Sequence, residues 1–160
     1  MAHKDLNSFV ELLRQEGELK EITLEVDPEL EISAITDRVV KQNGPALLFT
    51  NVKNHPDIPV LINTFGSRRR MELALGTETL DEIASEIADL INPRVPDSFS
   101  GKLQMLPRLA RLKNTQSKTV RSGPCNEVVE TNAASLSKLP IIKCWPNDGG
   151  KYITFPQVIT

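Results

Sequence analysis

The chain has 160 residues, of which 39% are hydrophobic, 25% charged and 4% aromatic, and its formal net charge is -2. This composition is typical of a globular protein with a Leu, Ile and Val core, and it argues against a global nucleic-acid binder. No run approaches the roughly 18 apolar residues that cross a bilayer, and the first residues lack a signal-peptide core, so we expect a cytoplasmic protein with at most peripheral membrane association.

Residues 1–92 alternate between helical and strand patterns. Apolar residues at helical spacing predict helices at residues 6–16, 27–43, 67–75 and 79–91, and short apolar runs predict strands at 19–26, 46–49 and 60–62. Asp27 and Pro28 are predicted to be the N-cap and first position of the second helix. The pattern predicts an α/β (α+β) amino-terminal domain, with helices on a small mixed sheet.

Residues 93–123 form a basic connection that contains proline and no acidic residue after Asp97. A short helix is expected near residues 106–112. The basic residues either contact nucleic acid or form a solvated face with interdomain salt bridges, and we favour the second reading. We therefore expect no nucleic-acid partner.

Residues 124–160 predict the start of a second, all-β unit, with short strands at 127–131, 141–142 and 152–160. Because two or three strands cannot bury a hydrophobic core by themselves, we expect this second unit to be incomplete. The segment from Cys144 to Gly150 predicts a tight hairpin turn with positive φ at its glycines. The alternative is that the paired glycines allow close approach of a ligand or another domain.

The residues by themselves predict no active site. We expect His3 and His55 to be exposed, and Cys125 and Cys144, which fit no zinc spacing, to be buried free thiols. Three consecutive arginines follow Ser67 at a predicted helix start. They either bind an anion or pair with acids of a neighbouring domain, and we favour the pairing.

An ordered set of short motifs resembles the UbiD family of decarboxylases over nearly the whole chain. The motifs are Glu16-Gly17-Glu18-Leu19, Val26-Asp27-Pro28-Glu29-Leu30-Glu31-Ile32, Gly44-Pro45-Ala46-Leu47-Leu48-Phe49, Asn63-Thr64-Phe65-Gly66-Ser67 with Arg69 and Arg70, Gly123-Pro124-Cys125, Leu139-Pro140-Ile141 and Cys144-Trp145-Pro146 to Gly150. Any one motif is weak, whereas the ordered set is specific.

The resemblance implies a non-oxidative (de)carboxylase of aromatic or α,β-unsaturated acids, similar to 3-polyprenyl-4-hydroxybenzoate carboxy-lyase of quinone biosynthesis. It implies prenylated FMN as the cofactor, with Mn²⁺ and K⁺, and a homo-oligomer from dimer to hexamer. The modified flavin acts as an electron sink while the protein orients substrate and moves protons. The implied fold continues from residue 124 into a split β-barrel like that of flavin reductases.

The resemblance implies one cofactor-binding position in this chain, Thr154, although Phe155 is the alternative at that place in the strand. Trp145 and Asp148 are expected to shape the barrel entrance. The family's metal ligands and catalytic residues correspond to positions after Thr160, so no catalytic or metal-binding residue is predicted here.

Two function classes remain open at this point: a piece of an enzyme, and a non-catalytic interaction or assembly module that keeps the amino-terminal fold. The sequence ends inside a predicted strand, which favours truncation because a natural domain rarely stops at an unpaired edge. We expect the isolated chain to bind no flavin tightly and to be inactive.

Overall fold

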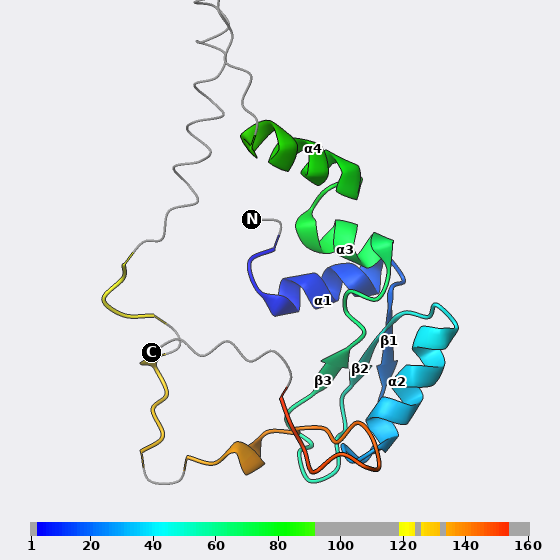
Figure 1. Ribbon diagram of the computed structural model, residues 1–160. Coiled ribbons are helices and arrows are strands. Elements are labelled where there is room, and N and C mark those ends of the chain that lie inside the picture. The colour runs from blue at the N-terminus through cyan, green and yellow to red at the C-terminus, as the bar shows by residue number, and fades with distance from the viewer. Residues whose placement is uncertain (1–2, 92–118, 124–125, 132–133, 154–160) are drawn as a thin grey trace, which may run out of the picture. The chain divides into compact units, whose positions relative to one another are not determined.

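The computed structural model describes residues 3–91, 119–123, 126–131 and 134–153. Its elements, in chain order, are α1 (Leu6–Gln15), β1 (Leu19–Ile22), α2 (Glu31–Lys41), β2 (Ala46–Phe49), β3 (Val60–Ile62), α3 (Arg68–Leu75), α4 (Leu80–Ile91) and the 3-10 turn η2 (Leu136–Lys138) (Figure 1). The chain divides into two compact units, one made of residues 1–82 and 135–160 and the other of residues 83–134.

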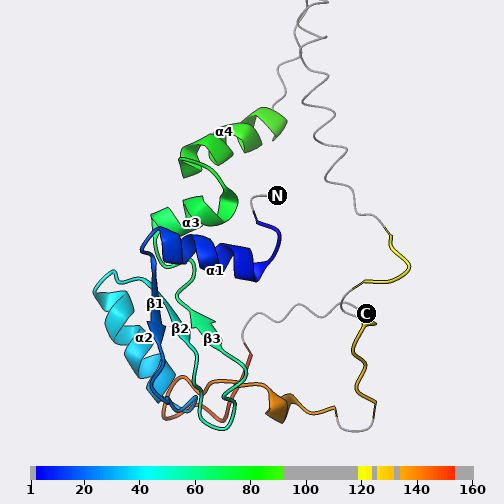
Figure 2. The ribbon, with the colours of Figure 1, turned by 180° about the vertical axis from the view of Figure 1, so that it is seen from behind.

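The three strands form one mixed sheet in the order β1-β2-β3. β1 pairs with β2 in parallel, with Leu19 opposite Ala46, and β2 pairs with β3 antiparallel, with Phe49 opposite Val60. In both views α2 lies alongside the strands of the sheet. α1 and α3 lie next to each other near the end of the sheet at which β1 begins (Figures 1 and 2). The expected α/β domain with helices on a small mixed sheet is confirmed.

Two hydrophobic clusters hold this unit together on the two sides of β2. Side chains alternate along a strand, so Leu47 and Phe49 face one side and Ala46 faces the other. The first cluster contains Val26, Ile32, Leu47, Phe49 and Val52, and the second contains Phe9, Leu13, Ala46 and Leu73. α2 therefore closes one face, and α1 with α3 closes the other.

α1 begins and ends as its residues dictate. The side chain of Asp5 accepts a hydrogen bond from the Ser8 backbone N–H at 2.8 Å, and Ser8 reciprocates in a capping box. At the other end Gly17 has φ +72°, and the Glu18 N–H donates to the Leu13 carbonyl at 2.8 Å. This left-handed termination favours glycine and turns the chain directly into β1.

The predicted start of the second helix is wrong. α2 begins at Glu31, four residues after the expected cap at Asp27, because residues 28–30 pair with Lys143 instead. The Leu30 N–H donates to the Lys143 carbonyl at 3.0 Å, and the Lys143 N–H donates to the Pro28 carbonyl at 3.1 Å. Asp27 makes a local turn in which its side chain accepts from the Glu29 N–H at 2.9 Å.

β1 is also shorter than predicted, because one extra residue interrupts its pairing with the segment after β2. Ile22 is opposite Phe49 and Val26 is opposite Val52, so four residue steps on one segment match three on the other. The extra residue leaves the ladder, and Leu24, which was expected to lie in the strand, is 78% exposed.

The strands predicted after residue 124 are not seen in the described part of the chain. Residues 127–131 are irregular, and residues 141–142 precede a single bridge, in which Lys143 pairs with Glu29. The predicted strand 152–160 is irregular at residues 152–153, and its remainder lies outside the described residues, as does the predicted helix at 106–112. Strands need hydrogen-bonded partners, and Val128 and Val129 remain exposed without one.

The later helices agree with prediction. Ser67 caps α3 by accepting from the Arg70 N–H, and Gly76 ends it with φ +67°. α4 spans the predicted residues, and its Glu82 carboxylate accepts a hydrogen bond from the Thr77 hydroxyl at 2.6 Å. No helix within the described residues has the length and apolarity required to cross a membrane.

Candidate functional site

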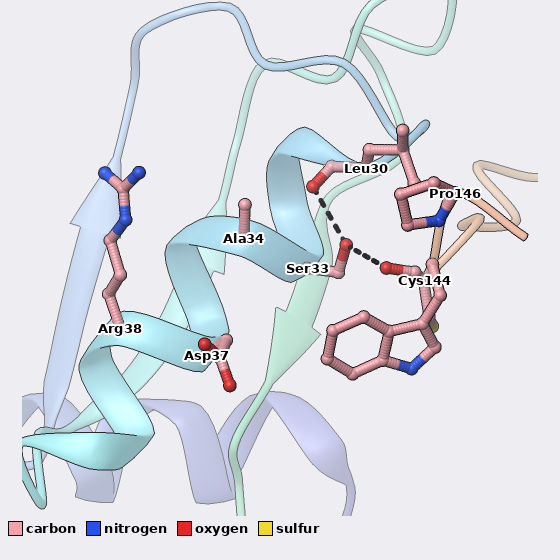
Figure 3. A pocket seen from close by; sticks show the side chains of 8 residues that line it. Leu30, Ser33, Ala34, Asp37, Arg38, Cys144 and Pro146 are labelled. Carbon is pink, nitrogen blue, oxygen red and sulfur yellow. Dashed lines mark hydrogen bonds between the residues drawn. The ribbon is translucent and has the colours of Figure 1, made fainter.

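A groove lies between α2 and the turn at residues 144–146. Its volume is about 310 Å³, and it is lined by Leu30, Ser33, Ala34, Asp37, Arg38, Cys144, Trp145 and Pro146. Figure 3 shows Pro146 next to Leu30, and Arg38 pointing away from the turn. Apolar side chains provide most of the lining near the turn, and Trp145 is 59% exposed.

Ser33 joins the two walls of this groove. Its hydroxyl oxygen lies 2.9 Å from the Leu30 carbonyl oxygen and 2.8 Å from the Cys144 carbonyl oxygen, so one proton is shared between them (Figure 3). The second bond spans 111 residues of sequence. Together with the backbone pairing of Lys143, it fixes the turn against the start of α2.

The turn itself is closed by Asp148. The Asp148 N–H donates to the Trp145 carbonyl at 3.1 Å, and the Asp148 carboxylate accepts from the Trp145 N–H at 2.8 Å. Beyond the turn, the Tyr152 N–H donates to the Ile142 carbonyl at 3.4 Å. A hairpin-like turn is therefore present, although the flanking residues do not form strands.

The prediction of positive φ at Gly149 and Gly150 is wrong. In the described residues, the glycines with positive φ are Gly17 and Gly76. A Cβ atom added at Gly149 or Gly150 would meet nothing within 4 Å. The turn closes through hydrogen bonds between Asp148 and Trp145, so neither backbone conformation nor packing within the described residues requires these two glycines.

The pKa values of two side chains are shifted near the junction, by which we mean the contact between residues 27–33 and residues 143–152. The pKa of Asp27 is lowered by the hydrogen bond from Lys53, whose Nζ lies 2.7 Å from the carboxylate, and then by the Glu29 N–H. The pKa of Tyr152 is raised by a hydrogen bond with Cys144, by burial and by the charge of Asp148. Both shifts come from contacts that hold the junction together.

The three arginines after Ser67 form ion pairs, as favoured, but with acids of their own unit rather than of a neighbouring domain. Arg68 pairs with Glu72 and Asp81, Arg69 pairs with Glu16, and Arg70 pairs with Glu18. Arg70 is 1% exposed, and its Nη1 lies 2.7 Å from the Glu18 carboxylate. The Glu18 carboxylate therefore binds the buried Arg70 guanidinium, whose Nε has no hydrogen-bond partner among the described residues.

The residues singled out in the sequence have different outcomes, and the predicted cofactor position stays a prediction. Thr154 and Phe155 lie outside the described residues, as does Cys125. His3, expected in a free tail, is half-buried with Nε2 2.8 Å from the Leu73 carbonyl oxygen, and His55 is half-buried in its turn. Cys144 is a half-buried free thiol. Sequence reasoning missed Ser33, because a lone serine on a helix carries no signal for a partner 111 residues away.

Several motifs of the predicted family resemblance contact one another in space. Glu16 and Glu18 bind Arg69 and Arg70. The Asn63 side-chain amide donates to the Pro45 carbonyl at 2.9 Å. Pro28 and Leu30 pair with Lys143, the residue that directly precedes the motif beginning at Cys144. The motifs within the described residues therefore specify a scaffold.

Two family models match this chain in order. The 3-octaprenyl-4-hydroxybenzoate carboxy-lyase N-terminal domain of the UbiD family matches residues 10–90, which is more than half of the chain. The Rift-related domain of the same carboxy-lyase matches residues 117–160. The chain belongs to the UbiD family. The resemblance inferred from the ordered motifs is thereby confirmed.

Relatives of this UbiD-family chain are longer proteins. An uncharacterized protein of Aquifex aeolicus is 45% identical over 160 residues, which cover 99% of this chain and 33% of that protein. An uncharacterized protein of Archaeoglobus fulgidus is 46% identical over 160 residues, which cover all of this chain and 32% of that protein. The chain thus spans about a third of the length of these relatives.

Solved UbiD-class structures share its fold. The open form of vanillic acid decarboxylase from Sedimentibacter hydroxybenzoicus matches with a TM-score of 0.68 and 29% identity, over 94% of this chain and 30% of the other. The UbiD-class enzyme HmfF from Pelotomaculum thermopropionicum in complex with FMN matches with a TM-score of 0.65 and 24% identity, over 92% of this chain and 28% of the other. Because HmfF is only 24% identical to this chain, its similarity shows the fold alone.

Proposed function

We propose that this chain is the amino-terminal part of a prenylated-FMN-dependent, non-oxidative (de)carboxylase of aromatic or α,β-unsaturated carboxylic acids. The observation that carries the proposal is the match of two UbiD models, in order, along one chain. The similarity to vanillic acid decarboxylase, an enzyme named for an aromatic acid, supports the substrate class. A 3-polyprenyl-4-hydroxybenzoate of quinone biosynthesis is one candidate substrate, as the names of the matching models suggest.

In this proposal prenylated FMN supplies an electron sink for decarboxylation. Thr154, at the position the family resemblance implies, is the residue of this chain that would face it. Among residues 3–91, 119–123, 126–131 and 134–153, no three His, Cys, Asp or Glu side chains come together as metal ligands. We therefore assign no metal ligand and no catalytic step to the described residues.

This chain's contribution would be structural. The Ser33 hydroxyl and the pairing of Lys143 hold the turn at residues 144–148 against α2. That turn leads into residues 152–160, which we propose as a strand of a split β-barrel that begins near residue 124, after the domain at residues 1–92 and the connection at 93–123. The isolated chain would then bind no flavin tightly, and the full-length protein would be a cytoplasmic homo-oligomer.

The test uses the full-length protein, co-expressed with a flavin prenyltransferase. Incubation with labelled bicarbonate and a panel of benzoic and cinnamic acids should place the label in the carboxylate of at least one acid, because decarboxylation is reversible. A protein that carries prenylated FMN and exchanges label into none of them would overturn the proposed reaction. A full-length protein that folds without flavin and shows no exchange would favour the assembly module.

A further inference from the structure

α4 presents an apolar face that no described residue buries. Its Leu and Ile side chains recur at helical spacing, so they share one face of the helix. α4 has no buried residue, and Ile87, Leu90 and Ile91 are 51%, 54% and 72% exposed. A contiguous apolar surface of this kind marks a site of interaction rather than a solvated helix face.

The ionisable side chains of α4 itself are all acidic, and Arg68 of α3 pairs with one of them, Asp81. α4 carries Asp81, Glu82, Glu86 and Asp89 and no basic residue. Glu86 stands four residues before Leu90, so it borders the apolar face, and it has no ion-pair partner in the described part of the chain. The carboxyl end of a helix is itself partially negative, and the last turn of α4 contains no basic residue.

These charges decide between possible occupants. A second copy of α4 would bring the same acidic side chains, among them Glu86 beside the apolar face, and no basic residue of its own, so self-association would add like charge to the contact. The occupant must therefore combine apolar side chains with positive charge.

We propose that the apolar face of α4 binds residues 102–113 of the same chain. This segment has no acidic residue, and it combines the apolar Leu103, Met105, Leu106, Leu109 and Leu112 with the basic Lys102, Arg108, Arg111 and Lys113. Its hydrophobic and basic residues thus complement those of α4.

The connection allows this contact. Ten residues, 92–101, separate α4 from the segment. They span up to about 33 Å when extended, whereas a helix of the length of α4 is about 18 Å long, so the segment reaches every part of the face. The short connection also gives the segment a high effective concentration near α4.

Hydrogen–deuterium exchange in the 160-residue chain tests the contact. The variant Leu109→Asp/Leu112→Asp places two charges in the segment and leaves α4 unchanged. The expected result is exchange about tenfold faster at the amides of residues 83–91, because the helix loses the contact that protects it. The matched control Gln116→Asp/Ser117→Asp adds the same charge outside the apolar run and should leave these amides unchanged. Protection of the β2 amides in each variant confirms that the sheet is folded.

The reciprocal variant Ile87→Asp should accelerate exchange at residues 102–113, and 1 M salt should weaken the contact in the wild-type chain. Leu24→Asp, at an exposed apolar residue outside α4, is its control. Two results overturn the proposal. One is α4 exchange that is the same in the wild type and in the segment variant. The other is protection of the α4 amides that rises with protein concentration and is unchanged in the segment variant. That result would mean that a second copy of the chain covers the face.

Discussion

Arg69 and Arg70 are adjacent in sequence, and each forms an ion pair, but the two ion pairs differ in their exposure to water. The side chain of Arg69 is 49% exposed and that of Arg70 is 2% exposed, although each binds a glutamate just after α1. An exposed pair is screened by solvent, whereas removing one partner of a buried pair leaves an uncompensated charge. The same residue type therefore has two different energetic roles.

Substituting the two glutamates should separate these roles. Glu18→Ala leaves the Arg70 guanidinium buried and unpaired, and we expect it to lower the free energy of unfolding by about 3 kcal/mol. Glu16→Ala removes the exposed partner of Arg69 and should cost less than about 1 kcal/mol. Urea unfolding of both variants checks the prediction, and equal losses would contradict it.

Asp27 should make the stability of the junction depend on pH. The pKa of the Asp27 carboxyl is lowered in the folded protein by Lys53 and the Glu29 N–H. The carboxylate therefore stabilises the fold at pH values above 3.8, its ordinary pKa. That contribution is lost as the pH falls through the lowered folded pKa. The stability difference between the wild type and Asp27→Asn should thus be larger at about pH 7 than at about pH 2.

Denaturant midpoints at the two pH values measure this difference. Asp57→Asn, at an exposed aspartate without an ion pair in the described residues, controls for the change of net charge. A gap between the wild type and Asp27→Asn that is equally large at both pH values would show that the Asp27 carboxylate is not the group responsible.

At the scale of the element, the turn between β3 and α3 depends on Gly66. A Cβ atom there would lie 1.8 Å from the Asn63 side-chain oxygen, and Asn63 is held by its amide to the Pro45 and Gly44 carbonyls. Gly66→Ala should displace Asn63 and lower stability by about 2 kcal/mol, the cost of losing such hydrogen bonds in a partly buried turn.

Gly149→Ala is the matched control for Gly66→Ala, because a Cβ atom at Gly149 meets nothing within 4 Å. It should leave the melting temperature unchanged or raise it slightly, since the unfolded chain loses freedom. Thermal unfolding of both variants gives the comparison. A Gly66→Ala variant as stable as Gly149→Ala would show that Asn63 yields without cost.

One side-chain hydroxyl, that of Ser33, joins α2 to the turn at residues 144–146, in addition to the backbone pairing of Lys143. Ser33→Ala removes the bond to the Cys144 carbonyl and should lower stability by about 1 kcal/mol. It should also change the fluorescence of Trp145, which is the only tryptophan and lines the same groove. Thr36→Ala removes a hydroxyl that binds only within α2, so it should leave the fluorescence unchanged.

The sequence predicts elements whose causes are local, and it fails where the cause is distant. The spacing of apolar residues and the caps at Ser67, Gly17 and Gly76 are local signals, and α1, α3 and α4 follow them. The start of α2 does not, because Lys143 pairs with residues 28–30 across more than a hundred residues of sequence. Of the groove, the turn residues were anticipated and Ser33 was not.

At the scale of the whole molecule, the described motifs of the family resemblance bind one another. The pairs join α1 to α3, β2 to the turn after β3, and α2 to the turn at residues 144–146. These long-range contacts hold the motif segments together in the folded chain. We infer that these residues serve as a scaffold for chemistry carried by the rest of the protein.

The visible absorbance spectrum tests this account most directly. The 160-residue chain and the full-length protein are each co-expressed with a flavin prenyltransferase, purified alike and compared for flavin absorbance per mole of chain. We predict a stoichiometric flavin signal from the full-length protein and none from the 160-residue chain. A stoichiometric signal from the 160-residue chain would contradict the scaffold role assigned to it.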